Sequence, residues 1–216
     1  MIKLTKGQEP DILQTNRQTW QQELKTEMDG GLTVNQAPTS KKYNQPEVKA
    51  TLMASSHSKC MYCESKVRHV DHGEIEHIKP KSTFPESIFE WENLGFVCAV
   101  CNNTKRDQYN TEIPIVNPFI DEPSDHLVPI GSTFFPKPGS NRGQITLTTV
   151  DLNRVDLVER RGDRVKQLHN LLEKASRLPQ ALKQAIETEV QSFVAATEEY
   201  SGTASAVLKA FNGNNR

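Results

Sequence analysis

The chain has 216 residues, and 26 lysine and arginine side chains against 27 aspartate and glutamate side chains give it a formal net charge of −1. This balance is unlike the marked basic excess of a free-standing nucleic-acid-binding protein, so any contact with nucleic acid must be local or shared with a partner. The composition, 35% hydrophobic and 25% charged, predicts a small core with long polar helices and loops, and no apolar run approaches the roughly 20 residues that cross a bilayer.

The N-terminal segment, residues 1–56, is expected to form an arm followed by helices. A short helix is predicted from about Thr19 to Met28, because the glycine pair that follows it readily closes a helix C-terminus. A second helix is predicted to begin at Pro46, since proline is favoured in the first helical turn. The polar residues between these two helices predict a loop.

The four cysteines lie in the central segment, residues 57–112, as two Cys-x-x-Cys pairs, Cys60/Cys63 and Cys98/Cys101. The chain begins without the apolar segment of a secretory signal, so we expect a cytoplasmic protein, and a reducing cytoplasm disfavours disulfides. Four thiolates in two short turns are instead typical of one tetrahedral zinc ion. Such a site leaves no position open for water, so this zinc is expected to be structural. The alternative is two unrelated pairs of free cysteines.

The C-terminal segment, residues 113–216, is expected to contain a loop and a strand followed by helices. The alternating run from Gln144 to Val150 predicts a strand. From about Arg154 to Ala210, apolar residues recur at helical spacing, and Pro179 predicts a break between two helices.

Three short strings of polar residues stand between the cysteine pairs and directly after them: Glu76-His77, Asn93 and Asn102. Their order resembles the HNH, or ββα-metal, nuclease motif. In that motif an acidic residue and a histidine on a first strand are followed by a central asparagine and by a final asparagine or histidine that opens a helix. The resemblance implies an α+β fold, with a small ββα core and a four-cysteine zinc centre embedded in a mostly helical surround.

The same resemblance implies a role for each residue in the hydrolysis of phosphodiester bonds. His77 is expected to be the general base, because an imidazole titrates near neutral pH. Glu76 and Asn102 offer the hard oxygen ligands that suit a catalytic Mg²⁺ or Mn²⁺. Asn93 is expected to steady the base from the loop. Lys105, one helical turn beyond Asn102, is expected to meet a substrate phosphate.

Several of these assignments have alternatives. Glu74 shares a strand face with Glu76 and competes with it as the metal ligand, and most members of the family carry aspartate rather than glutamate before the histidine. Asn103 is an alternative ligand to Asn102, and both asparagines also suit a helix N-cap position. His77 taken alone would be an ordinary surface histidine.

A narrower resemblance extends beyond the HNH motif. The strings Lys59 to Glu64, Ile75 to Lys81 and Trp91 to Leu94, with parts of the N-terminal arm and of residues 151–161, resemble the HNH nuclease subunit of Septu-type antiphage systems. Related subunits are encoded beside some retrons. The resemblance implies an effector nuclease held by an ATPase of the ABC/SMC-like kind and, in retron-associated systems, a reverse transcriptase and its msDNA as further partners. The N-terminal arm through Trp20 or the C-terminal helices are expected to contact the ATPase.

Two other functions compete with this one. A non-catalytic zinc module that binds nucleic acid or protein would not need His77. A stand-alone HNH nuclease of the restriction type would need a basic recognition domain, which the sequence lacks. The sequence does not distinguish DNA from RNA as the target, because nothing in the motif contacts a base edge.

Overall fold

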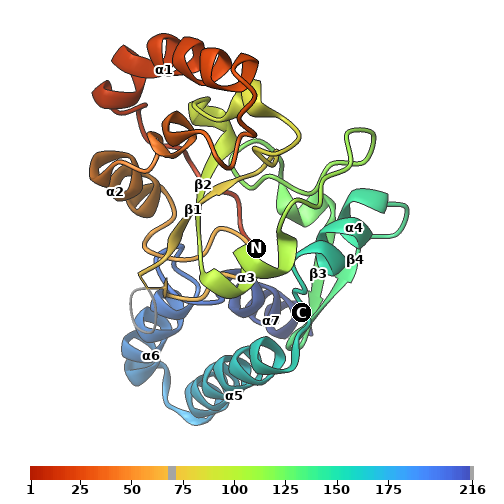
Figure 1. The fold of residues 1–216 in the computed structure, drawn as a ribbon. Coiled ribbons are helices and arrows are strands. Elements are labelled where there is room, and N and C mark those ends of the chain that lie inside the picture. Colours follow the sequence, from red (N-terminus) through yellow and green to blue (C-terminus); the bar gives the residue numbers. More distant parts are fainter. Residues whose placement is uncertain (68–71, 215–216) are drawn as a thin grey trace.

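The computed structural model describes residues 1–67 and 72–214 (Figure 1). Its α-helices are α1 (Asp11–Asp29), α2 (Pro46–Ser55), α3 (Ala99–Lys105), α4 (Asn141–Thr149), α5 (Val155–Arg177), α6 (Gln180–Phe193) and α7 (Ser201–Asn214). Its strands are β1 (Glu74–His77), β2 (Leu94–Val97), β3 (Leu127–Ile130) and β4 (Thr133–Pro136). Short 3-10 helices are η1 (Pro38–Lys41), η3 (Pro85–Ser87), η4 (Trp91–Asn93) and η5 (Pro123–Asp125). No helix of the described residues is long and apolar enough to span a membrane.

The centre of the molecule is a ββα unit built from β1, β2 and α3 (Figure 1). The two strands are antiparallel, with Glu76 opposite Gly95 and His77 opposite Leu94. Every residue of β2 is buried, which is typical of a strand covered on both faces. Helix α2 contacts both strands and α3 contacts β1. The predicted α+β fold with a ββα core in a mostly helical surround is therefore confirmed.

A glycine in β2 lets the first cysteine turn lie directly on the sheet. A Cβ atom at Gly95 would stand 2.1 Å from the Sδ of Met61, closer than two atoms can approach. The backbone N–H of Met61 donates to the carbonyl of Phe96 at 3.0 Å. Close backbone approach of this kind is a common reason for glycine inside a strand.

The N-terminal helices close one side of the main hydrophobic core. Helix α1 is longer than predicted and begins at Asp11 rather than near Thr19. It buries Leu13, Trp20 and Leu24, and the Trp20 ring packs against Phe89 with 5.6 Å between the ring centroids. Helix α2 begins at Pro46, as predicted.

The predicted strand from Gln144 to Val150 is wrong, because this segment is helix α4. Ser140 caps the helix by accepting a hydrogen bond from the N–H of Gly143 at 3.1 Å, which satisfies one of the free donors of the first turn. The buried residues of α4 follow helical spacing, since Gly143, Thr146 and Leu147 share one face. A short hairpin of β3 and β4, which the sequence analysis did not predict, precedes α4.

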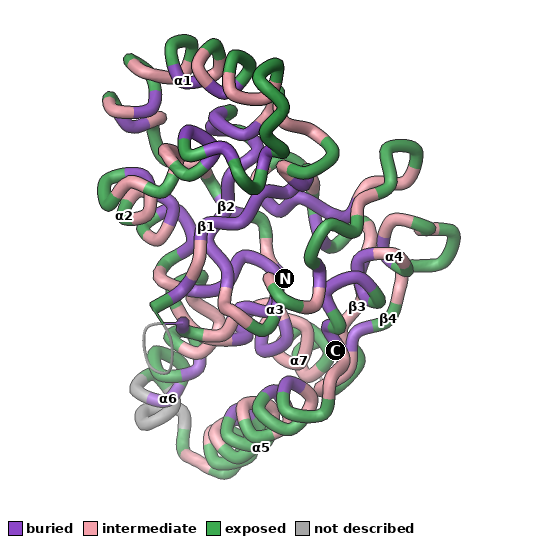
Figure 2. Tube along the Cα trace, in the orientation of Figure 1, coloured by how far each residue is buried: buried purple, intermediate pink, exposed green. Residues whose placement is uncertain are grey.

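Helices α5, α6 and α7 enclose a second, smaller core. Its buried residues are Leu168, Leu172, Ile186, Val190 and Ala204. The break predicted at Pro179 separates α5 from α6, but the chain from Val155 to Asn214 forms three helices rather than two. Much of the outer surface of α5 is exposed (Figure 2).

Candidate functional site

The four cysteine sulfurs meet beneath the ββα unit. The Sγ atoms of Cys60, Cys63, Cys98 and Cys101 all lie within 4.8 Å of one another, and those of Cys63 and Cys98 are 3.9 Å apart. Sulfurs bound to one tetrahedral zinc at about 2.3 Å are about 3.8 Å apart. The prediction that the two pairs converge is confirmed, and the geometry fits one zinc ion held by four thiolates.

Neighbouring groups orient the sulfurs and balance their charge. Cys98 is the N-cap of α3, and its Sγ accepts from the N–H of Cys101 at 3.5 Å. The Nη1 of Arg154, at the start of α5, lies 3.6 Å from the Sγ of Cys101. Burial lowers the pKa of Arg154, but the charge of the cysteine sulfurs raises it above its ordinary value. Arg154 therefore remains a cation beside a site that carries negative charge when its thiols ionise.

A buried carboxylate fixes the first cysteine turn to both ends of the chain. Glu64 Oε1 lies 2.5 Å from the α-amino group of Met1, and Oε2 accepts from the hydroxyl of Ser201 at 2.9 Å. Burial raises the pKa of Glu64, but the α-amino group and Lys59 lower it below its ordinary value. The sequence analysis did not assign this role to Glu64, because its partners are 63 and 137 residues away along the chain.

Glu76 and Lys105 form a buried ion pair between β1 and α3. The Lys105 Nζ is 2.6 Å from Glu76 Oε1 and donates to the backbone carbonyl of His77 at 3.0 Å. The Lys105 side chain is fully buried, so the predicted contact with a substrate phosphate does not fit this arrangement. Burial raises the pKa of Glu76 to about 7, against the opposing effect of Lys105.

Glu74 and Asn102 make a second contact between the same two elements, since the Asn102 amide donates to the Glu74 carboxylate. Asn102 lies within α3 and does not cap it, because the helix begins at Ala99 and its N-cap is Cys98. The predicted N-cap role of Asn102 or Asn103 is therefore wrong. Asn103 is exposed, and Asn102 rather than Asn103 faces the strand.

His77 is a buried imidazole with one nitrogen already bonded. Its Nε2 lies 3.0 Å from the carbonyl oxygen of Ile88. A carbonyl only accepts, so the ring proton lies on Nε2, and Nδ1 carries the lone pair. Burial lowers the pKa of His77 to about 4, and Lys81 and Lys105 also lower it. The imidazole is therefore neutral at pH 7, the form that a general base requires.

Asn93 joins two points of the segment that follows His77 in the chain. Its Oδ1 accepts from the N–H of Lys79 at 2.7 Å, and its Nδ2 donates to the carbonyls of Lys79 and Ser87, each at 3.0 Å. Ser87 directly precedes Ile88, whose carbonyl fixes the imidazole. The arrangement suits the predicted role of Asn93, in which it steadies the base through the backbone.

Comparison with known families shows which family the ββα unit resembles. Residues 60–108 match the HNH endonuclease family model. We call this stretch the HNH domain. The match covers both cysteine pairs, both strands and α3, so the HNH resemblance seen in the sequence is confirmed.

Two curated proteins are similar over a longer stretch than the HNH domain. The Septu protein PtuB of Bacillus thuringiensis is 32% identical over 115 residues, which cover 53% of this chain and 44% of that protein. The Septu protein PtuB of Bacillus mycoides (strain KBAB4) is 28% identical over 158 residues, covering 58% of this chain and 53% of that protein. The chain spans about half the length of the curated relatives it matches. The predicted resemblance to Septu-type proteins is also confirmed.

One aromatic residue outside the HNH domain, Tyr43, contacts His77. The Tyr43 ring stands edge-on to the His77 imidazole, with 4.4 Å between the centroids and 85° between the planes. Burial raises the pKa of Tyr43, and the carboxylates of Glu76 and Glu74 raise it further. Tyr43 is thus near both His77 and the acidic residues of the domain. No signal in the sequence marks Tyr43, because it belongs to no motif and reaches the site only through the packing of η1 and α2.

The structure therefore groups the predicted residues in two sets. Glu76, Asn102 and Lys105, with Glu74, lie on the side of β1 that faces α3. His77 comes next along the strand, so its side chain leaves from the opposite face. The carboxylates and the imidazole do not touch one another in this structure.

Proposed function

We propose that this chain is a metal-dependent endonuclease that hydrolyses phosphodiester bonds of nucleic acid through its HNH domain. The observation that carries the proposal is the state of His77. A neutral imidazole is fixed at Nε2 by the Ile88 carbonyl and follows directly after a buried carboxylate on β1. His77 and this carboxylate also belong to the stretch that matches the HNH endonuclease family model.

The donor set between β1 and α3 fits a hard divalent cation. Glu74, Glu76 and Asn102 offer carboxylate and amide oxygens, the ligand class of Mg²⁺ and Mn²⁺. Glu76 is 4% exposed, and such a buried carboxylate requires a cation partner, a position that Lys105 fills in this structure. We propose that Glu76 and Asn102 hold the catalytic ion, with Glu74 as a further donor. When bound, the ion would neutralise charge that grows on the phosphate and on the leaving oxygen.

The other roles in hydrolysis, which are proton transfer and the positioning of the base, are assigned to residues of the chain. His77 Nδ1 accepts a proton from the attacking water. At the same time the oxygen of this water forms a bond to phosphorus, and the ester P–O bond breaks. The Ile88 carbonyl stabilises the resulting imidazolium through Nε2–H. Asn93 acts as a positioning residue, because it fixes the backbone that carries this carbonyl. The structural zinc holds the ends of the ββα unit together and takes no part in the reaction.

We further propose that the chain is the effector nuclease of an antiphage system. The support is the similarity to two proteins named Septu protein PtuB. The resemblance implies an ABC/SMC-like ATPase as the partner and, in retron-associated systems, a reverse transcriptase and its msDNA. The near-zero net charge of the chain suits a nuclease that binds nucleic acid weakly by itself and depends on a partner.

The direct test is cleavage of plasmid DNA and of single-stranded RNA by the purified zinc-loaded protein. We expect cleavage with added Mg²⁺ or Mn²⁺ and none without a divalent cation of this kind. The absence of cleavage of both substrates, alone and with the ATPase present, would favour the non-catalytic zinc module.

The contact with the ATPase can be located by hydrogen exchange. The N-terminal arm is part of the main core through Met1, Leu4 and Leu13, so its deletion would disturb the fold as well as the contact. We expect ATPase binding to slow exchange in α1 or in α5–α7. Unchanged exchange in all four helices would contradict docking through either end of the chain.

A further inference from the structure

We propose that Tyr43 and Lys49, which lie outside the HNH domain, bind a backbone phosphate of the nucleic acid strand that the domain cuts. This inference rests on the proposed function. It assigns part of substrate binding to the segment between η1 and α2, which no motif in the sequence marks.

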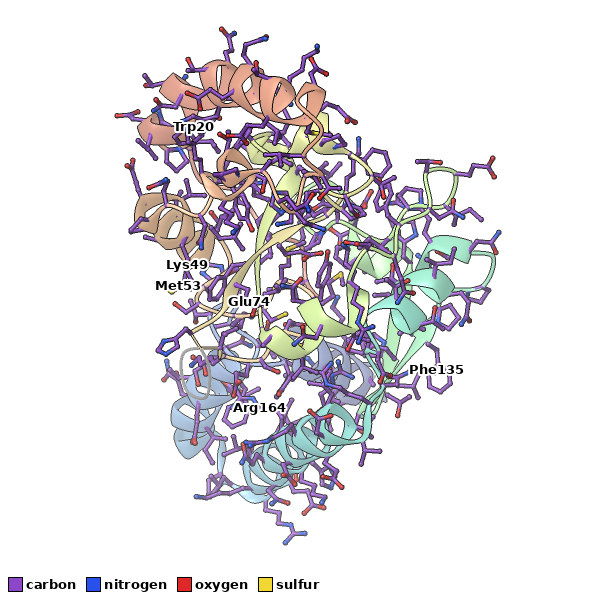
Figure 3. The ribbon with its side chains drawn as sticks, viewed as in Figure 1. Trp20, Lys49, Met53, Glu74, Phe135 and Arg164 are labelled. Carbon is purple, nitrogen blue, oxygen red and sulfur yellow. The ribbon has the colours of Figure 1, made fainter. Side chains whose placement is uncertain are left out.

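A small cavity brings this segment to the HNH domain. Tyr43, Asn44 and Lys49 line one side of it, and Glu74 and Asn102 line the other, together with Gly73 and Ile75. Figure 3 shows Lys49 on α2 beside Glu74 at the start of β1. The cavity measures about 200 Å³, which is below the roughly 300 Å³ of the smallest drug-sized pockets. It is large enough for a phosphate group, and the Lys49 ammonium and the Tyr43 hydroxyl on its wall suit an anion.

Lys49 is a cation that has no ion-pair partner among the described residues at this cavity. Among residues 1–67 and 72–214, no ion pair or hydrogen bond engages its Nζ. Nearby lysines differ in this respect, since Lys42 contacts Glu23 and Lys59 contacts Glu64. A half-buried lysine that has no acidic partner and faces a cavity is suited to an anionic ligand, and a phosphate oxygen is the anion that a nuclease substrate supplies.

Tyr43 adds a neutral hydrogen-bond donor beside the base. Its raised pKa keeps the hydroxyl protonated, and no hydrogen bond within the described part of the chain uses that hydroxyl. Its ring contacts the His77 imidazole. Tyr43 therefore joins the cavity, which it lines, to the residue that is proposed to activate water.

The opposite wall of the cavity explains how an anion is tolerated near a carboxylate. Glu74 and Asn102 are oxygen donors to the proposed catalytic ion, so the cavity has cation ligands on one wall and phosphate ligands on the other. Lys81 adds positive charge, with its Nζ 5.9 Å from the Tyr43 ring centroid. A phosphate bridged to a divalent cation fits both walls at once.

The test measures binding separately from cleavage. In a His77→Ala background, Lys49→Ala, Lys49→Arg and Tyr43→Phe are compared for binding of a fluorescein-labelled oligonucleotide in Mg²⁺ by anisotropy, at several salt concentrations. Lys166→Ala is the matched control, because Lys166 is 79% exposed on α5, a helix that lies well away from α2 in Figure 1. Zinc content and thermal midpoint confirm that each variant is folded.

We expect Lys49→Ala to weaken binding about ten-fold and to lower the slope of log K against log salt by about one, as for the loss of one phosphate contact. Lys49→Arg should retain binding, and Tyr43→Phe should weaken it several-fold. If Lys49→Ala binds like the Lys166→Ala control, or if the parent protein does not bind the oligonucleotide, the inference is overturned. The proposed function has a separate test: it is contradicted if protein with an intact His77 does not cleave nucleic acid.

Discussion

The Nζ of Lys105 lies 2.6 Å from the Oε1 of Glu76, and both side chains are buried between β1 and α3. The ammonium therefore lies against the carboxylate that is proposed to bind the divalent cation. Isolated buried carboxylates are costly, and removal of one partner of a buried pair leaves the other uncompensated. The pair explains how the domain can hold this acidic residue in its interior.

Removal of Lys105 should destabilise the protein in a way that a divalent cation reverses. We expect Lys105→Met to lower the free energy of unfolding by about 3 kcal/mol, because Glu76 then lacks a buried cation. Added Mn²⁺ should restore part of this loss, since it can neutralise the same carboxylate. Urea unfolding with and without Mn²⁺ measures both effects. A double variant with Glu76→Gln should show no such recovery, and an equal response to Mn²⁺ in both variants would contradict the account.

Asn93 should affect catalysis through the position of the base. We expect Asn93→Ala to lower kcat by about 10²-fold with little change in KM, because a small displacement of catalytic groups is costly. Stability should fall by about 1–3 kcal/mol, since three backbone groups lose their partner. Steady-state cleavage and urea unfolding measure the two effects. An unchanged kcat in a folded variant would show that Asn93 does not position the base.

The sequence predicts where the motif residues lie better than the contacts between them. The convergence of the cysteine pairs and the helix from Pro46 follow from local patterns, the strand that carries Glu76-His77 follows from the HNH resemblance, and the structure confirms all three. The buried position of Lys105 does not follow from any local pattern, because lysine is usually exposed and only the packing of α3 on β1 encloses it. The role of Tyr43 is equally hard to predict from the sequence, since its contact with His77 joins residues that are 34 positions apart and Tyr43 belongs to no motif.

The error at α4 has a local physical cause. Alternation of Ile145, Leu147 and threonines suggests a strand, and β-branched residues favour one. The serine cap and the buried positions of Gly143 and Thr146 instead fit a helix that packs on the main core. A Cβ at Gly143 would stand 2.1 Å from the His126 carbonyl oxygen, so only the tertiary contact explains this glycine.

Arg154 should control how tightly the zinc is held. We expect the wild-type protein to contain about one zinc per chain, and Arg154→Gln to lose it to a chelator about ten-fold faster, as for other groups that support metal ligands. The reason is the loss of a cation next to the Cys101 sulfur. Arg177→Gln is the matched control, because Arg177 is 79% exposed at the end of α5. Equal rates of zinc loss in the two variants would exclude a role for Arg154.

His77 should make the protein less stable in mild acid. Its pKa is about 4 in the fold against an ordinary value of 6.5, so between these values the unfolded chain takes up a proton that the folded protein does not. Stability from this group is complete above pH 6.5 and is lost as the pH falls toward 4. We expect the wild-type protein to lose about 2 kcal/mol more than His77→Gln between pH 7 and pH 5. Parallel losses in urea unfolding would show that His77 protonates normally.

The most direct measurement is the rate of Mg²⁺-dependent cleavage by His77→Ala against His169→Ala, scored together with toxicity in cells. His169 is 59% exposed on α5, outside the HNH domain. We expect His77→Ala to reduce cleavage by at least about 10²-fold, the usual contribution of a general base, and to abolish toxicity, while His169→Ala retains both. Cleavage by folded, zinc-loaded His77→Ala at the rate of the control would contradict the assignment of His77 as the base of this nuclease.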